Sequence, residues 1–109
     1  MSEARLVYVT AASRADALAI GRACVEARLA ACANVFDGAT SVYWWQGRLT
    51  EDGEAILVMK SRAPLIDSLT ARVKELHSYS VPCVVVLPIV AGNPAYLDWI
   101  AAEATGGAA

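Results

Sequence analysis

The chain has 109 residues, which is enough for one domain and too few for two. Hydrophobic residues make up 57% of it and charged residues 18%, with a formal net charge of −2. Soluble domains are commonly about 45–50% apolar, so the excess predicts a surface that binds other subunits. The acidic balance and the absence of a basic run argue against a nucleic-acid partner. No apolar run reaches the roughly 20 residues of a membrane-spanning helix, so we expect no membrane partner.

The cysteine pattern indicates a reducing compartment. Cys24, Cys32 and Cys83 form an odd set with no C-x-x-C pair. Such thiols are typical of small buried side chains in a cytoplasmic protein. The first sixteen residues carry an acid before the first arginine and only a short apolar stretch, so they do not predict a signal peptide. We therefore expect a cytoplasmic location.

The beginning of the chain predicts a strand followed by a helix. Apolar side chains dominate residues 5–9, which favours a strand. Ser13 and Asp16 have the spacing of a capping box at the start of a helix. Small apolar residues then recur at helical spacing as far as about Arg28.

Two long strands joined by a tight turn are predicted next. The second strand is predicted to start at residues 32–36, to be interrupted at Asp37 and Gly38, and to continue to Trp44 and Trp45. The third strand ends in the apolar run at residues 55–60, which predicts a central place in the sheet with both faces buried.

Two glycine dipeptides compete for the turn between these strands. Asp52-Gly53 is the stronger turn signal, but a turn there would set Glu51 opposite Glu54, and facing like charges are destabilising. We therefore place the turn at Gln46-Gly47, and we interpret Asp52-Gly53 as a bulge within a long third strand.

The paired tryptophans raise the question of what covers them. Side chains alternate along a strand, so Trp44 and Trp45 must point to opposite faces. We expect one to meet the helices and the other to lie on the open face or at an edge. Burying one tryptophan removes about 150–250 Å² from water, so a second copy of the chain is the expected cover.

The C-terminal half predicts a helix, a strand and a final helix. Pro64 suits the first turn of a helix, whose buried face has helical spacing: Ile66, Leu69, Val73 and Leu76. Residues 81–89 predict the fourth strand. Asn93 and Pro94 fit the cap and first position of the last helix. Residues 104–109 are expected to form a flexible tail.

The order of these elements is strand, helix, strand, strand, helix, strand, helix. It is the pattern of an α+β, ferredoxin-like split βαβ sandwich with an additional C-terminal helix. We expect one domain over residues 1–109, ordered from about residue 4 to residue 104. Such a sheet carries its helices on one face and leaves the other face bare.

Four segments between residues 6 and 100 resemble the CutA family of divalent-cation tolerance proteins. They read ARLAACANVF (27–36), SVYWWQGRL (41–49), LHSYSVPCVVVLPI (76–89) and YLDWI (96–100). The resemblance implies a ferredoxin-like subunit in a tight homotrimer, with long hairpins that extend sheets across subunit boundaries. It also implies tolerance of copper and other divalent cations, and no agreed enzymatic reaction. No catalytic arrangement is found, so we expect no enzyme.

The chain departs from the family pattern after the second helix. The usual His-Pro-Tyr-Glu-x-Pro-Glu is replaced by His-Ser-Tyr-Ser-Val-Pro-Cys at residues 77–83, without either acid. Copper-binding members can also use a cysteine in the first strand, where this chain has Val9. His77 and Cys83 are the candidate metal ligands, and a thiolate would favour Cu(I). Alternatively, His77 stabilises the helix C-terminus and Cys83 is an inert buried thiol.

Other side chains are candidates for an inter-subunit cleft or for the trimer interface. Lys60 is either a strand-end cation or an anion-binding group in the cleft. The other candidate cleft residues are Tyr43, Trp45 and Tyr79, and the candidate interface residues are Trp44, Trp45 and Trp99.

Three functions therefore remain open. The first is a metal-tolerance homotrimer with no obligatory cofactor that binds copper or another divalent cation. The second is a small-molecule sensor similar to the trimeric PII signalling proteins, with ligands in clefts between subunits. The rigid hairpin counts against nucleotide sensing. The third is a structural trimer without a ligand.

Overall fold

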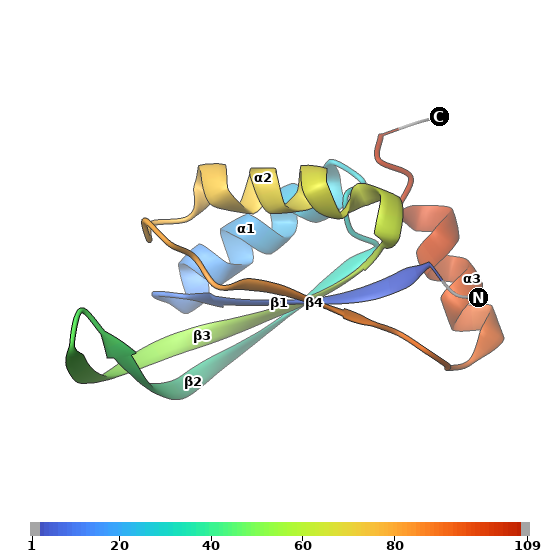
Figure 1. The fold of residues 1–109 in the computed structure, drawn as a ribbon. Coiled ribbons are helices and arrows are strands. Elements are labelled where there is room, and N and C mark those ends of the chain that lie inside the picture. Colours follow the sequence, from blue (N-terminus) through green and yellow to red (C-terminus); the bar gives the residue numbers. More distant parts are fainter. Residues whose placement is uncertain (1–2, 108–109) are drawn as a thin grey trace.

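In the computed structural model, which describes residues 3–107, four strands form one antiparallel sheet and three α-helices accompany it (Figure 1). The sheet has the strand order β2-β3-β1-β4. A 3₁₀ turn, Ala63–Leu65, precedes α2. The elements are β1 (Ala4–Ala11), α1 (Arg14–Glu26), β2 (Cys32–Trp45), β3 (Arg48–Arg62), α2 (Ile66–Leu76), β4 (Val84–Pro88) and α3 (Pro94–Glu103). The predicted element order and the α+β class are confirmed.

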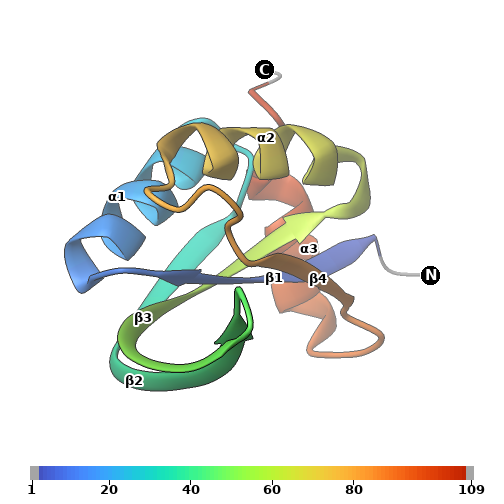
Figure 2. The ribbon, with the colours of Figure 1, turned by 60° about the vertical axis from the view of Figure 1, so that its left-hand side comes forward.

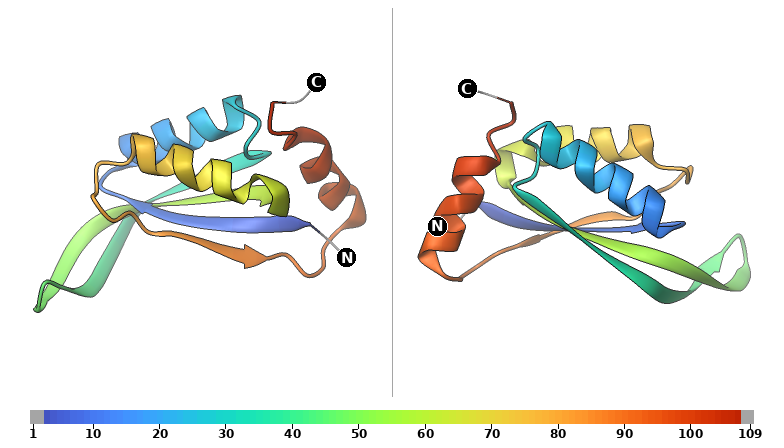
Figure 3. Two further views of the ribbon diagram at one scale, coloured as in Figure 1. Left: turned by 45° about the horizontal axis from the view of Figure 1, so that its top comes forward. Right: turned by 180° about the vertical axis from the view of Figure 1, so that it is seen from behind.

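The core lies between the sheet and two of the helices. Helices α1 and α2 cover the same face, and α3 lies at one end of the sheet (Figure 3). Alternate residues of β1 and β3 point into this layer and are fully buried: Val7, Val9, Ala11, Ala55, Leu57 and Met59. Helices α1 and α2 supply the opposite wall through Ile20, Leu69 and Val73. The remaining strand positions are left on an open face.

Local signals start α1 and α3 where the sequence predicted, whereas α1 ends at Glu26, two residues before the predicted end. The Ser13 side chain accepts a hydrogen bond from the Asp16 N–H at 3.1 Å. Asn93 Oδ1 accepts one from the Ala95 N–H at 3.1 Å, with Pro94 as the first residue of α3. Pro64 differs slightly, because it lies in the 3₁₀ turn just before α2.

The hairpin between β2 and β3 has the predicted turn. Trp45 pairs with Arg48 and Trp44 with Leu49. Gln46 and Gly47 have φ values of 49° and 77°, and two positive φ angles are those of a type I′ turn, which matches the twist of the flanking strands. The hairpin curves markedly along its length (Figure 2).

The predicted bulge position is wrong. The register shifts between Phe36 and Ala39, so the bulge contains Asp37 and Gly38 of β2, and Gly53 pairs in register with Thr40. Gly38 has a φ of 78°, and its N–H donates to its neighbour's carboxylate at 2.8 Å. Bulges are favoured on edge strands, and β2 is the edge strand here, whereas β3 has β2 on one side and β1 on the other.

Neither tryptophan of the pair meets the helices, which corrects a second expectation. Trp44 is 71% exposed and Trp45 is 44% exposed. The reason is the length of the hairpin: β2 and β3 run beyond the helical layer, so both faces of their far ends are free of it (Figure 1).

Two segment ends also differ from expectation. The fourth strand spans only Val84–Pro88, because Pro82 has no N–H to donate to a ladder. Ala104 is buried, and the Gly106 N–H donates to the Arg28 carbonyl at 2.8 Å, so the start of the expected flexible tail packs against the fold. Residues 108 and 109 lie outside the described part. Within residues 3–107, no helix has the length and apolar character needed to cross a bilayer.

Candidate functional site

The open face of the sheet is apolar through its middle. Its exposed or half-buried side chains come from all four strands: Leu6, Tyr8, Phe36, Ile56, Val58, Val85 and Leu87. The third strand is therefore central but buried on one face only. Phe36 alone is 56% exposed. Monomeric proteins rarely leave such a patch in water.

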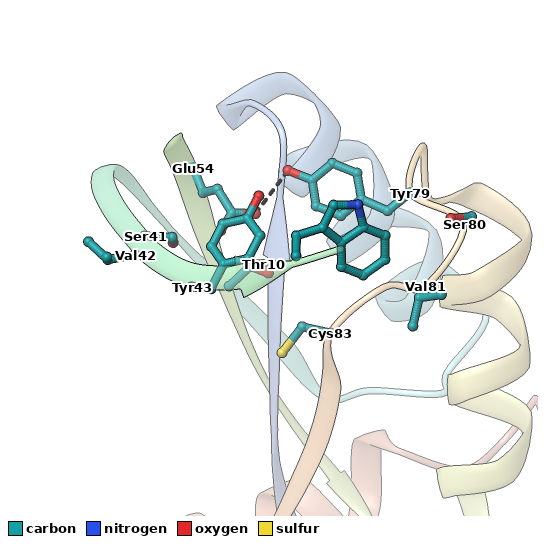
Figure 4. Close-up of a pocket in the computed structure, with 10 residues that line it drawn as sticks. Thr10, Ser41, Val42, Tyr43, Glu54, Tyr79, Ser80, Val81 and Cys83 are labelled. Carbon is teal, nitrogen blue, oxygen red and sulfur yellow. Dashed lines mark hydrogen bonds between the residues drawn. The ribbon is translucent and has the colours of Figure 1, made fainter. Parts of the chain in front are cut away.

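A cavity of about 550 Å³ lies between the hairpin and residues 79–83, the segment that leads from α2 towards β4 (Figure 4). The hairpin supplies one wall, and the end of β1 contributes Thr10. The lining residues are Thr10, Ser41, Val42, Tyr43, Trp45, Glu54, Tyr79, Ser80, Val81 and Cys83. Three predicted cleft residues, Tyr43, Trp45 and Tyr79, thus come together beside Cys83.

Two tyrosine–carboxylate pairs hold this cavity in shape. The Tyr79 hydroxyl donates to Glu54 at 2.8 Å, which ties the 79–83 segment to the hairpin (Figure 4). The Tyr43 hydroxyl donates to Asp52 at 2.6 Å along the hairpin. Charge-assisted bonds of this kind are stronger than neutral ones.

Both tyrosines are stabilised as neutral phenols. Burial and then the bond to Glu54 raise the pKa of Tyr79 to about 12. The bond to Asp52 raises the pKa of Tyr43 above its ordinary value, with a smaller effect from desolvation. An ionised phenolate beside a carboxylate would be a pair of like charges, which disfavours ionisation.

His77 is engaged within the chain through both ring nitrogens. Nε2 lies 2.7 Å from the Thr10 carbonyl oxygen, and Nδ1 accepts the Tyr79 N–H at 3.1 Å. A carbonyl can only accept, so Nε2 carries the proton and Nδ1 offers its lone pair to the backbone. His77 therefore fixes the start of the 79–83 segment, and it does not line the cavity.

Cys83 is the soft donor that lines the cavity. Its side chain is half-buried and forms no disulfide. Within residues 3–107, no group of three or more His, Cys, Asp or Glu side chains is arranged to hold a metal ion. One copy of the chain therefore brings a thiol to the cavity without a full set of metal ligands around it.

Lys60 lies apart from the other predicted cleft residues within one chain. Its Nζ donates to Asn34 Oδ1 at 3.1 Å and lies 5.8 Å from the centre of the Tyr96 ring. Lys60 pairs with Leu6 of β1, whereas the cavity begins at Thr10, four residues and so roughly 13 Å further along the strand. Trp99 lies beside the Tyr96 ring, with the ring centres 5.4 Å apart, and is partly exposed.

Sequence reasoning missed the two carboxylates that accept hydrogen bonds from the cavity tyrosines. Asp52 and Glu54 entered the prediction only as residues near a turn. The predicted register already contained the signal: once Trp45 pairs with Arg48, alternation places Asp52 and Glu54 on the same face as Tyr43.

Comparison with known proteins agrees with this fold. The family model for CutA1 divalent ion tolerance protein matches residues 5–103. The divalent-cation tolerance protein CutA of Thermus thermophilus is 48% identical over 95 residues, which cover 87% of this chain and 92% of that protein. The chloroplastic CutA 1 protein of Oryza sativa is 42% identical over 87% of this chain, which spans only 54% of the rice protein.

The solved structures agree as well. The structure of the divalent cation tolerance protein from Thermus thermophilus superposes with a TM-score of 0.90 at 45% identity, over 92% of this chain and 97% of that one. The sheet, the helices and the order of the elements are thus shared with a solved relative of high identity. The chain belongs to the CutA1 divalent ion tolerance protein family.

Proposed function

We propose that this protein contributes to tolerance of divalent and transition-metal ions as a cytoplasmic homotrimer, with copper as the preferred ion. Family membership supports the tolerance role. The observation that carries the metal proposal is the Cys83 thiol in the wall of the cavity, since a thiolate is a ligand that selects Cu(I).

The ligand set of one chain does not fit a complete copper site. Both ring nitrogens of His77 are bonded within the chain, Nε2 as a donor and Nδ1 as an acceptor, and Glu54 accepts the Tyr79 hydroxyl. A metal at Cys83 therefore requires donors from a second copy or from a small ligand. This requirement links the proposed metal site to the proposed assembly.

The homotrimer is supported by the surfaces that one chain leaves uncovered. The open face exposes Phe36, Val85 and Leu87, and the hairpin exposes Trp44. We assign Trp44 and Trp99 to contacts between copies and Trp45 to the edge of a cleft between them. The free cysteines support a cytoplasmic location. The family name describes a tolerance function rather than a reaction, and we propose no enzymatic activity.

A small-molecule sensor is the second candidate. Its supporting observation is the size of the cavity, about 550 Å³, which is within the range of ligand pockets. A structural trimer without a ligand remains the outcome if neither metal nor small molecules bind.

Calorimetric titration with Cu(I) under reducing conditions tests the metal proposal. We expect saturable binding to the wild type and loss of that binding in Cys83→Ser. Cys32→Ser is the matched control, because Cys32 is also half-buried but lies beside Tyr96, and it should bind as the wild type does. His77→Gln tests whether this ring supplies a ligand in the assembly. Absence of binding, or undiminished binding by Cys83→Ser, contradicts the site.

A further inference from the structure

We propose that the cavity behind the hairpin binds a small organic cation of the alkylammonium class, held between the rings of Tyr43, Trp45 and Tyr79 with Glu54 as the counter-charge. The inference concerns the same cavity as the proposed metal site, but it depends on different side chains. It holds whether or not Cys83 binds a metal.

The first argument is the concentration of aromatic rings. Tyr43 and Trp45 are two positions apart on β2, so they point to the same side of the strand. Tyr79 lies across the cavity from Tyr43, on the segment after α2 (Figure 4). All three rings line the cavity. A cation within about 6 Å of such rings is attracted by their electron-rich faces.

The second argument is the sign of the charge. The lining residues include one acid, Glu54, and no lysine, arginine or histidine. None of the three ion pairs within residues 3–107 involves Glu54 or its neighbour Asp52. Arg48, opposite Trp45, is exposed and is not in the cavity wall. The lining that one chain supplies therefore attracts cations and disfavours phosphorylated or other anionic ligands.

The third argument is that two of the three rings, those of Tyr43 and Tyr79, are held by hydrogen bonds before a ligand arrives. Tyr43 and Tyr79 each donate to a carboxylate, at 2.6 Å and 2.8 Å. Donation to a carboxylate shifts electron density onto the phenol, which strengthens the attraction of its ring for a cation. Because the two tyrosine rings are already oriented, they lose little side-chain entropy on binding.

The side chains that one chain supplies suit an alkylammonium ion better than a bare metal ion. A metal needs several donor atoms around it, and the described residues contain no such group. An alkylammonium ion instead uses aromatic faces and a single carboxylate. Cys83 is a further lining residue, so the thiol and the rings can be tested separately.

Titration with tetramethylammonium chloride, followed by nuclear magnetic resonance, tests the proposal on the assembled protein. tert-Butanol is the neutral probe of similar shape. We expect saturable binding of tetramethylammonium and markedly weaker binding of tert-butanol. No binding of tetramethylammonium, or equal binding of both probes, overturns the proposal.

Variants locate the site. Trp45→Leu should weaken tetramethylammonium binding roughly two- to thirty-fold, which is the range for loss of a cation–π contact. Tyr96→Leu is the matched control, because Tyr96 is a similarly exposed aromatic residue that does not line the cavity, and it should leave the affinity unchanged. Glu54→Gln preserves volume and should weaken tetramethylammonium but not tert-butanol. Equal effects of Tyr96→Leu and Trp45→Leu would overturn the assignment.

The same variants separate this proposal from the metal site. Cys83→Ser should keep tetramethylammonium binding while losing Cu(I), and Glu54→Gln should weaken tetramethylammonium binding while keeping that of Cu(I). Loss of tetramethylammonium binding in Cys83→Ser, with wild-type mass and fold, would contradict the use of separate side chains. Failure of Cu(I) binding alone contradicts only the metal proposal.

Discussion

Tyr79 joins the two walls of the cavity through one hydroxyl group. It belongs to the segment after α2, and its partner Glu54 belongs to β3, 25 residues earlier. His77 links the same segment to β1, because its ring bonds to the Thr10 carbonyl and to the Tyr79 N–H. The position of the Tyr79 ring therefore depends on contacts with two strands.

Tyr79 should ionise later than an ordinary tyrosine. Its pKa is raised from 10.0 to about 12 by burial and by Glu54, so the folded protein keeps this proton between about pH 10 and pH 12 while the unfolded chain loses it. Stability from this group is present below pH 10 and falls as pH rises through that window. Ultraviolet titration of the wild type against Tyr79→Phe measures the effect.

The variant should lack the latest-titrating tyrosine and should lose less stability at alkaline pH. In Glu54→Gln the pKa should fall only part of the way towards 10, because burial is the larger cause. If the tyrosine signal that Tyr79→Phe loses titrates near pH 10 instead of near pH 12, the Tyr79–Glu54 contact is contradicted.

The residues of the site were only partly predictable. Tyr43, Trp45, Tyr79 and Cys83 were all singled out from the sequence, and the cavity brings them together. The place of His77 was not predictable, because its ring bonds to a backbone oxygen 67 residues away. Side chains that depend on such tertiary contacts have no local signal.

The β2–β3 hairpin is the element that gives the cavity its outer wall. Its turn requires Gly47 at a φ of 77°, a conformation that costs an L-residue roughly 1–2 kcal/mol. Gly53, in the same hairpin, has no positive φ and open space around its Cβ position.

Gly47→Ala should therefore lower the free energy of unfolding by about 1 kcal/mol, because the new Cβ strains the turn. Gly53→Ala is the matched control and should change it by less than about 0.5 kcal/mol. Urea denaturation of both variants and the wild type gives the comparison. Equal effects at the two glycines would contradict the turn at Gln46-Gly47.

Elements were predictable where their signals were local. The caps at Ser13 and Asn93 and the Gln46-Gly47 turn depend on neighbouring residues, and the structure confirms them. The bulge was not predictable, because two Asp-Gly dipeptides carry the same local signal. The choice between them follows from which strand lies at the edge of the sheet, a property of the whole fold.

At the scale of the whole molecule, the elongated shape explains the uncovered surfaces. The principal extents are 44 × 26 × 22 Å, and the hairpin projects beyond the helices (Figure 3). By strand alternation, Trp44 points to the same face of the sheet as the helices, but the helices do not extend as far as Trp44. The sequence predicted that a partner chain would cover one tryptophan. Trp44 is exposed in the single chain, which is consistent with that prediction.

Trp44→Ala should weaken assembly. Covering this 71% exposed side chain contributes roughly 3–4 kcal/mol per chain as an upper bound. Glu26→Ala, at an exposed position of α1, is the control and should leave assembly unchanged. Light scattering across a dilution series compares the two variants. If the two variants dissociate over the same range of protein concentration, Trp44 is not part of the proposed interface.

Sedimentation equilibrium of the dilute wild-type protein tests the central claim, that copies of this chain cover its open face and hairpin. We predict a single species with three times the 11.5 kDa mass of one chain. A folded species with the mass of one chain would contradict the homotrimer and the dependence of the metal site on a second copy.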